Sequence, residues 1–178
     1  MEFRAAIRSA AVPLVMAHPT WPLFDLIVRT PMLELRVPTD DEITTLVAQA
    51  DSTIYERTGF MPFAIDWTGN PIESMKYFWG TRSNWAADNW TLSLLPFIDG
   101  EPLGNQALRS VDFPIVRRVD TGSWLVSSAQ GRGIGTEMRA AAMHLAFAGL
   151  DALEAHSEAH VDNQASNGVS RRLGYETT

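Results

Sequence analysis

The residues best suited to do chemistry lie in one short stretch, Gln130 to Thr136, which reads Q-G-R-G-I-G-T. Its three alternating glycines lack a Cβ atom, so the main chain can bring several N–H groups close to a ligand. A short apolar run, Trp124 to Val126, precedes the stretch, and an alanine-rich helical pattern follows it. The start of a helix directs its unpaired N–H groups and the positive end of its dipole at one point. A strand, a glycine loop and a helix start in this order predict a phosphate site.

The spacing of the glycines excludes two common phosphate loops. A dinucleotide fingerprint needs G-x-G-x-x-G, but the third position falls on Thr136 from the first glycine and on Met138 from the second. A P-loop ends in Gly-Lys-Ser/Thr, and this stretch contains no lysine. The pattern that fits is Q-x-x-G-x-G, formed by Gln130, Gly133 and Gly135. A glycine-rich turn without a ligand is the alternative at this point.

A second group of polar residues follows one predicted strand later. Residues 162–167 read D-N-Q-A-S-N and lead to S-R-R-L-G-Y at 170–175. These segments resemble the D-N-x-x-S-x…L-G-Y/F motif of the GNAT acyltransferase superfamily, and Q-x-x-G-x-G resembles its acyl-coenzyme A pyrophosphate loop. The strand L-E-L-R at Leu33 and the turn at Asp99-Gly100 also lie where the family has them. The resemblance covers residues 31–178 and points more narrowly to the branch of ribosomal-protein N-terminal alanine/serine acetyltransferases.

The resemblance implies an α/β fold, a mixed central sheet with flanking helices. The sheet would be splayed open between a strand at 122–128 and a strand at 153–161. Acetyl-coenzyme A would be the cosubstrate, with no metal, and Asn163 would organise the backbone and touch the coenzyme. The pantetheine arm would bond to the main chain of Leu125, Val126 and Ser127. The residues implied for the pyrophosphate are Gln130, Gly131, Arg132, Gly133, Ile134, Gly135 and Thr136.

The chemistry that the resemblance implies is direct transfer of an acetyl group to a primary amine, of a protein N-terminus or of a small molecule. Ser166 would protonate the departing thiolate. Glu158 and His156 fall on the polar face of the predicted strand at 153–161, and either could take the proton of the amine through water, with Glu158 the candidate that we name. Each role has an ordinary alternative, because Ser166 can cap or pack its helix and Glu158 and His156 can form a solvated strand face. Two other functions stay open: a non-catalytic acyl-coenzyme A sensor or scaffold, and an acyltransferase that uses a larger group such as succinyl.

Composition narrows the class of protein. The chain has 178 residues, 46% of them hydrophobic, which suits one domain with a proper core. A formal net charge of −7 argues against a nucleic-acid partner and favours cationic acceptors such as amines. There is no cysteine, so any thiol chemistry must come from a cofactor. His156 and His160 alone do not indicate a metal site.

The chain divides into an N-terminal extension at 1–30 and one acyltransferase domain at 31–178. The apolar part of the first nineteen residues is interrupted by Pro13 and is too short to span a membrane. We therefore expect a cytoplasmic protein with no membrane contact.

The elements that must position the site follow from periodicity and capping signals. Thr39 and Glu42 predict a capping box at a helix start, and Asn70-Pro71 predicts a second helix to about Ala87 that buries Met75, Phe78 and Trp79. An aromatic segment, Tyr55 to Trp67, is interpreted as core cover or as the lining of an acceptor pocket. The other expected elements are strands at 33–37, 90–98 and 102–111, a link at 116–120, a helix from the glycine loop to Gly149, and a helix from Asn163 to Leu173.

The family resembled here continues past L-G-Y with two more strands, whereas only Glu176, Thr177 and Thr178 follow Tyr175. We therefore expect the last strand or strands to be absent and the acceptor side to be open. A bared strand edge offers unpaired N–H and C=O groups, which favours a homodimer formed through that edge.

Overall fold

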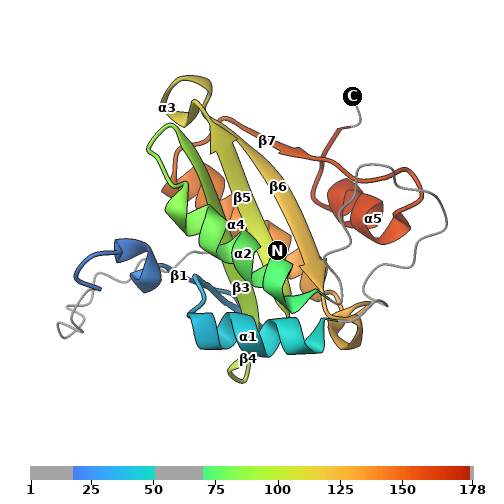
Figure 1. Cartoon of the computed structure of the whole chain (residues 1–178). Helices are drawn as coiled ribbons and strands as arrows, with labels where there is room; N and C mark the ends of the chain where they lie inside the picture. Colours follow the sequence, from blue (N-terminus) through green and yellow to red (C-terminus); the bar gives the residue numbers. More distant parts are fainter. Residues whose placement is uncertain (1–17, 51–69, 177–178) are drawn as a thin grey trace.

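The computed structural model describes residues 18–50 and 70–176, which form one seven-stranded sheet with helices on both faces (Figure 1). The strands lie in the order β1-β2-β3-β5-β6-β7, and β4 pairs with β3. All neighbours are antiparallel except β6 and β7, which are parallel. The strands are β1 (Ile27–Arg29), β2 (Glu34–Arg36), β3 (Asn89–Ile98), β4 (Glu101–Pro102), β5 (Gly104–Val111), β6 (Arg118–Leu125) and β7 (Glu154–Ser157). The predicted mixed α/β fold is confirmed.

The helices cover the sheet in two layers. In Figure 1, α1 and α2 lie in front of the strands and α4 lies behind them. The α-helices are α1 (Asp40–Gln49), α2 (Pro71–Ser83), α3 (Phe113–Val116), α4 (Ile134–His144) and α5 (Gln164–Arg172). Short 3₁₀ turns lie at Pro22–Asp25 and Ser127–Ala129, and a π-helical turn, Leu145–Gly149, extends α4. None of the described helices is long and apolar enough to cross a membrane.

The core lies between the sheet and these two helical layers. Apolar residues at helical spacing face the strands from α1 and from α4, as their periodicity predicts. The buried residues of these elements include Leu35, Ile43, Leu46, Leu94, Leu95, Leu108, Ile134 and Met138. Residues 22–29, which the sequence analysis assigned to an extension, contribute a 3₁₀ turn and strand β1 to the same fold.

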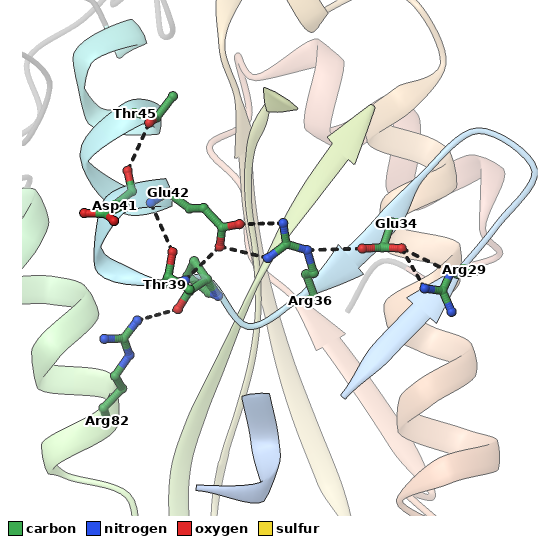
Figure 2. Close-up of polar contacts among 9 residues, drawn as sticks. Arg29, Glu34, Arg36, Thr39, Asp41, Glu42, Thr45 and Arg82 are labelled. Atoms are coloured by element: carbon green, nitrogen blue, oxygen red, sulfur yellow. Dashed lines mark hydrogen bonds and ion pairs between the residues drawn. The ribbon is translucent and has the colours of Figure 1, made fainter. Parts of the chain in front are cut away.

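The capping box predicted at the start of α1 is confirmed. The Glu42 N–H donates to Thr39 Oγ1 at 3.3 Å, and the Thr39 N–H donates to Glu42 Oε2 at 2.8 Å. The Glu42 carboxylate also accepts two hydrogen bonds from Arg36 of β2, at 2.8 and 2.5 Å (Figure 2). Arg82 of α2 binds Asp40 Oδ1 at 2.5 Å, so charged groups join β2, α1 and α2 at one point.

These contacts change the ionisation of Glu42. Burial raises the pKa of its carboxyl, but the hydrogen bonds from Arg36 and Thr39 and the positive charge of Arg36 together outweigh burial and leave the pKa below its ordinary value. The hydrogen bond to Glu42 is also the largest cause of the raised pKa of Arg36. The pair therefore stays charged in the folded protein and fixes α1 on β2.

The second predicted helix differs from expectation at its end and on one face. Trp79, predicted to be buried, is 49% exposed, and its indole N–H donates to Asp40 Oδ2 at 3.2 Å. Phe78 is buried as predicted, and Met75 is half-buried. The helix ends at Ser83 rather than near residue 87, and Trp85 stacks on Trp90 of β3 with 5.7 Å between ring centroids. A tertiary ring contact thus replaces the last predicted turn.

The predicted link at 116–120 is wrong. The chain forms α3 and then enters β6 at Arg118. Asp112 and Arg117, on either side of α3, have left-handed backbone conformations with φ of 55° and 47°. Neither residue is a glycine, so the sequence contains no sign of these turns. The return strand at 102–111 is split into β4 and β5, because the Leu103 N–H turns to Pro96 O at 2.9 Å.

Two strands end earlier than predicted. β6 ends at Leu125 and not at residue 128, because Ser127–Ala129 forms a 3₁₀ turn. β7 spans only Glu154–Ser157 of the predicted 153–161. It is the last strand of the described sheet, and its pairing with a second copy stays a prediction. The aromatic segment Tyr55 to Trp67 lies outside the described residues.

Candidate active site

The two parallel strands at the end of the sheet separate part of the way along their length. Their ladder runs from Arg118 opposite Glu154 to Thr121 opposite Ser157. Beyond that point β6 continues to Leu125 against β5, whereas the chain leaves β7 and turns toward α5 (Figure 1). The site must therefore be built from the end of β6, the loop after it, and the start of α5.

The glycine loop has the backbone conformation that a close-approaching ligand requires. Gly131 and Gly133 have φ of 70° and 83°, a region that residues with a side chain rarely adopt. A Cβ atom at either position would have no other atom within 4 Å, so both positions are open. Gly135 differs, because its Cβ would lie 3.6 Å from Leu125 Cδ1 and 3.9 Å from Val169 Cγ2. It lets α4 pack closely against β6 and α5.

The start of α4 carries no side-chain cap. Gly133 occupies its N-cap position, whereas Thr39, Asn70 and Asn163 each cap their helices with a side-chain oxygen. The first N–H groups of a helix need acceptors from outside the helix, and an anion can supply them. Arg132 lies exposed between the two left-handed glycines. The loop therefore has the features of a phosphate-binding site.

Some main-chain groups of Leu125 and Val126, which were predicted to bind the pantetheine arm, already form hydrogen bonds within the protein. The Val126 N–H donates to Leu103 O at 2.9 Å, and Val126 O accepts from the Ala129 N–H at 2.9 Å. The side-chain amide of Gln130 donates to Leu125 O at 3.0 Å. Gln130 therefore shapes the strand end in addition to opening the loop. Its contact with pyrophosphate, like those of Ile134 and Thr136, stays a prediction.

Ser166 and Asn163 lie together at the start of α5. Asn163 Oδ1 accepts from the Ser166 N–H at 3.0 Å, so Asn163 has the organising role predicted for it. The hydroxyl Oγ of Ser166 accepts from Arg139 Nη2 at 3.4 Å. The structure thus directs Ser166 toward α4, while its role as an acid stays a prediction.

The predicted base, Glu158, makes no direct polar contact with the predicted acid, Ser166, in the part of the chain that the structure describes. Glu158 follows the end of β7 and is exposed. His156 is also exposed, and its Nε2 lies 3.6 Å from a carboxylate oxygen of Glu154. Within the ranges 18–50 and 70–176, no hydrogen bond or ion pair joins Glu158 to Ser166. A proton relay from Glu158 would have to pass through water.

Sequence reasoning missed one residue of this region, Arg139 on α4. It is only 3% exposed, and its guanidinium reaches serine hydroxyls of three other elements. A signal exists in the helix, since Gly135, Ala142 and Ala146 lie at spacings of three and four around it. Small residues on the same face indicate close packing, which makes an arginine among them unusual.

Comparison with known proteins identifies the family. The family described as "Acetyltransferase (GNAT) domain" matches residues 32–176. RimL, a ribosomal L7/L12 alpha-N-protein acetyltransferase in complex with coenzyme A, has 26% identity and a TM-score of 0.65, covering 84% of this chain and 83% of that one.

Two further structures share the fold. Mycobacterium smegmatis RimJ in complex with CoA-disulfide has 21% identity and a TM-score of 0.69, covering 84% of this chain and 73% of that one. An acetyltransferase from Salmonella typhimurium, described as modifying the N-terminal serine of ribosomal subunit protein L7/L12, has 24% identity and a TM-score of 0.63, covering 84% of each chain. The predicted class of enzyme, an acyl-coenzyme A-dependent N-acetyltransferase, is confirmed, and this chain belongs to the GNAT acetyltransferase family.

Proposed function

We propose that the protein transfers the acetyl group of acetyl-coenzyme A to the α-amine of a protein N-terminus. The observation that carries the proposal is the uncapped start of α4 behind two left-handed glycines, in the loop that follows the part of β6 left unpaired by β7. Similarity to RimL supports a protein N-terminus as the acceptor. We place the reaction in the cytoplasm, which suits an acceptor of the ribosomal class that the RimL description names.

The chain's own residues suit the coenzyme in two respects. The N–H groups at the start of α4 and the open backbone at Gly131 and Gly133 would hold the pyrophosphate. The end of β6 beyond Thr121 would receive the pantetheine arm, with the Leu125 N–H as the group to test because the Val126 N–H is already bonded to Leu103. The bound thioester supplies an activated acetyl group. Main-chain donors near its oxygen would stabilise the charge that develops there.

Ser166 and Glu158 complete the proposed chemistry. Ser166 gives a proton to the sulfur as the C–S bond breaks, and Glu158 takes the proton of the attacking amine through water. The position of Ser166 in the first turn of α5, fixed by Asn163, supports its role. The exposure of Glu158 makes it the less constrained of the two assignments.

A pair of glycine variants tests the coenzyme site. Gly133→Leu should abolish binding of coenzyme A measured by calorimetry, because the side chain would occupy the open position and strain the loop. Gly100→Leu is the matched control, since Gly100 also has a positive φ, 84°, and open space around it, but lies in the turn between β3 and β4. Loss of binding in both variants, or in neither, would contradict the assignment of the loop.

A further inference from the structure

The guanidinium of Arg139 is the centre of a cluster of serine hydroxyls, which we call the serine cluster. Arg139 Nη1 donates to Ser170 Oγ at 2.9 Å and to Ser157 Oγ at 3.3 Å. Its Nη2 donates to Ser123 Oγ at 2.9 Å and to Ser166 Oγ at 3.4 Å, the longest of the four. Four of the five N–H groups of the guanidinium are thus paired with four hydroxyls, and the buried Nε–H has no partner.

The cluster joins the elements around the predicted site. Ser123 lies on β6, Ser157 ends β7, and Ser166 and Ser170 lie on successive turns of α5. The β6–β7 ladder ends at Ser157, so Arg139 lies where the strands begin to separate. The cluster therefore lies in the region proposed for the reacting end of the coenzyme, one turn of α4 beyond the glycine loop.

The positive charge of Arg139 has no negative partner among the residues that the structure describes. In the part of the chain that the structure describes, no carboxylate lies within 4.0 Å of its nitrogen atoms. Burial lowers the pKa of the guanidinium, and the nearby Tyr175 acts in the opposite direction. An arginine nevertheless stays protonated in proteins. A buried charge without a counter-ion is costly to maintain, and such a cost points to a use for the charge.

The other charged groups of the neighbouring elements are engaged elsewhere or exposed. The carboxylate of Glu137 on α4 accepts from the Thr30 hydroxyl and the Met32 N–H. The remaining ionisable groups of these elements are Asp120, which pairs with Arg109; Glu154, which lies near His156; His144, which is half-buried at the end of α4; and Arg118, Glu158, Asp162, Arg171 and Arg172, which are exposed. Among the described residues Arg139 therefore has no counter-ion, which leaves its charge available to a bound ligand.

The hydrogen-bond chemistry of the cluster leaves the hydroxyl hydrogen of Ser166 available to another acceptor. A guanidinium only donates, whereas a serine hydroxyl both donates and accepts. Because Ser166 Oγ accepts from Arg139, its own hydrogen must point to another acceptor. The Ser166 N–H is already held by Asn163. Ser166 is thereby presented as a proton donor, the orientation that a general acid requires.

We propose that Arg139 is a positioning residue for departure of the thiol: it holds Ser166 as a proton donor and its charge favours the thiolate. The inference rests on the proposed function. The acceptor amine forms the new C–N bond while the C–S bond breaks, and sulfur keeps the electron pair of that bond. Ser166 Oγ gives its proton to the sulfur, and the proton released by the amine returns through Glu158 and water to Ser166.

The pKa of the thiol of bound coenzyme A measures the effect of the Arg139 charge without any enzymatic turnover. The protein has no cysteine, so the ultraviolet absorbance of a thiolate belongs to the coenzyme alone. In the wild-type complex the apparent pKa of this thiol should lie below that of free coenzyme A. Arg139→Gln should raise it by about one pH unit, as expected for loss of a nearby opposite charge. Arg139→Lys, which keeps a charge, should leave it close to the wild-type value.

Arg109→Gln is the matched control for charge, because Arg109 lies on β5 and is paired with Asp120 at the surface. It should leave the thiol pKa unchanged. If the wild-type protein does not bind coenzyme A, the proposed function fails and this inference fails with it. If coenzyme A binds and Arg139→Gln leaves the thiol pKa at the wild-type value, or if the wild-type value equals that of free coenzyme A, the inference fails while the proposed function stands. If Arg139→Gln does not fold, the Arg139→Lys variant and a double-mutant cycle with Ser166→Ala test the inference instead.

A double-mutant cycle separates positioning from simple packing. Arg139→Lys should lower kcat about tenfold with little change in KM for acetyl-coenzyme A, because lysine cannot reproduce the forked contacts. In a Ser166→Ala background the same change should have almost no effect on kcat, since the two residues act as a unit. Equal losses of kcat in both backgrounds would show that Arg139 acts through packing and would overturn the inference.

Discussion

Ser166 shows how much of an individual residue's role depends on the hydrogen bonds around it. Taken alone, a serine in a first helical turn is an ordinary packing or capping residue. Here its N–H is bound by Asn163 and its Oγ accepts from a buried arginine. The bond from Arg139 makes Ser166 Oγ an acceptor on that side and leaves its hydroxyl hydrogen for another acceptor, as the proposed role of acid requires.

Ser166→Ala should therefore lower kcat by about a hundredfold, the lower end of what a general acid contributes, with a smaller change in affinity for coenzyme A. Steady-state rates and calorimetry on the same variant give the two quantities. Ser170→Ala is the matched control, because Ser170 lies one turn later and accepts from the same guanidinium at 2.9 Å. If Ser170→Ala reduced kcat as much as Ser166→Ala, the role of acid would not belong to Ser166.

At the scale of an element, α1 is fixed to the sheet by one carboxylate that makes two kinds of contact. Glu42 closes the capping box and also binds Arg36 of β2. Figure 2 shows the ion pairs continuing through Glu34 to Arg29, so a single stripe of charge joins β1, β2 and α1. The stripe lies away from the proposed site and serves the scaffold.

The lowered pKa of Glu42 makes this anchor depend on pH. A group whose pKa is lower in the folded state contributes stability above its unfolded pKa, 4.5 by its ordinary value, and loses it as the pH falls through the folded pKa. The free energy of unfolding should thus decline below about pH 4.5. Glu42→Gln should cost about 1 kcal/mol at pH 7 and flatten that decline. Urea unfolding at pH 7 and pH 4 measures both effects.

Glu73→Gln provides the comparison for this prediction. Glu73 occupies the third position of α2, as Glu42 does in α1, but within 18–50 and 70–176 its carboxylate meets only the exposed Lys76. An exposed pair of this kind contributes little. Glu73→Gln should therefore leave the loss of stability between pH 7 and pH 4 nearly unchanged. If it reduced that loss as much as Glu42→Gln does, the proposed role of Glu42 in anchoring α1 would be contradicted.

The elements that sequence predicted well are those whose cause is local. Thr39 and Glu42 lie three residues apart and satisfy each other, and the alternating glycines at 131 and 133 adopt the conformations that glycine permits. Trp79 and the start of β6 were predicted wrongly because their causes are distant or unmarked. Asp40, in another helix, holds Trp79 at the surface, and Asp112 and Arg117 adopt left-handed backbone without being glycine.

At the scale of the whole molecule, the candidate site is assembled from parts far apart in the chain. The glycine loop and the Asn163–Ser166 turn were predictable because each has its own motif. The serine cluster was not, since Arg139 meets Ser123, Ser157 and Ser166 only after β6, β7, α4 and α5 have packed together. No periodicity along one segment shows such a meeting.

The overall charge bears on the acceptor. A formal net charge of −7 favours approach of a cationic N-terminus at moderate salt. The attacking amine must nevertheless be neutral when it reacts, so the enzyme has to accept a protonated amine and remove its proton. Glu158, exposed after β7, is the carboxylate proposed for that step.

The most direct test of the central claim is the transfer itself. The protein should be incubated with acetyl-coenzyme A and with peptides that begin with serine or alanine, with an N-terminally blocked peptide and a panel of small amines as comparisons. Mass spectrometry reads acetylation of the peptide, and a thiol reagent reads coenzyme release, with no background from a protein that has no cysteine. The account predicts one acetyl group on the free N-terminal amine, matched by thiol release and absent with Gly133→Leu. Acetylation of small amines alone, transfer of succinyl in preference to acetyl, or coenzyme binding without any transfer would contradict it.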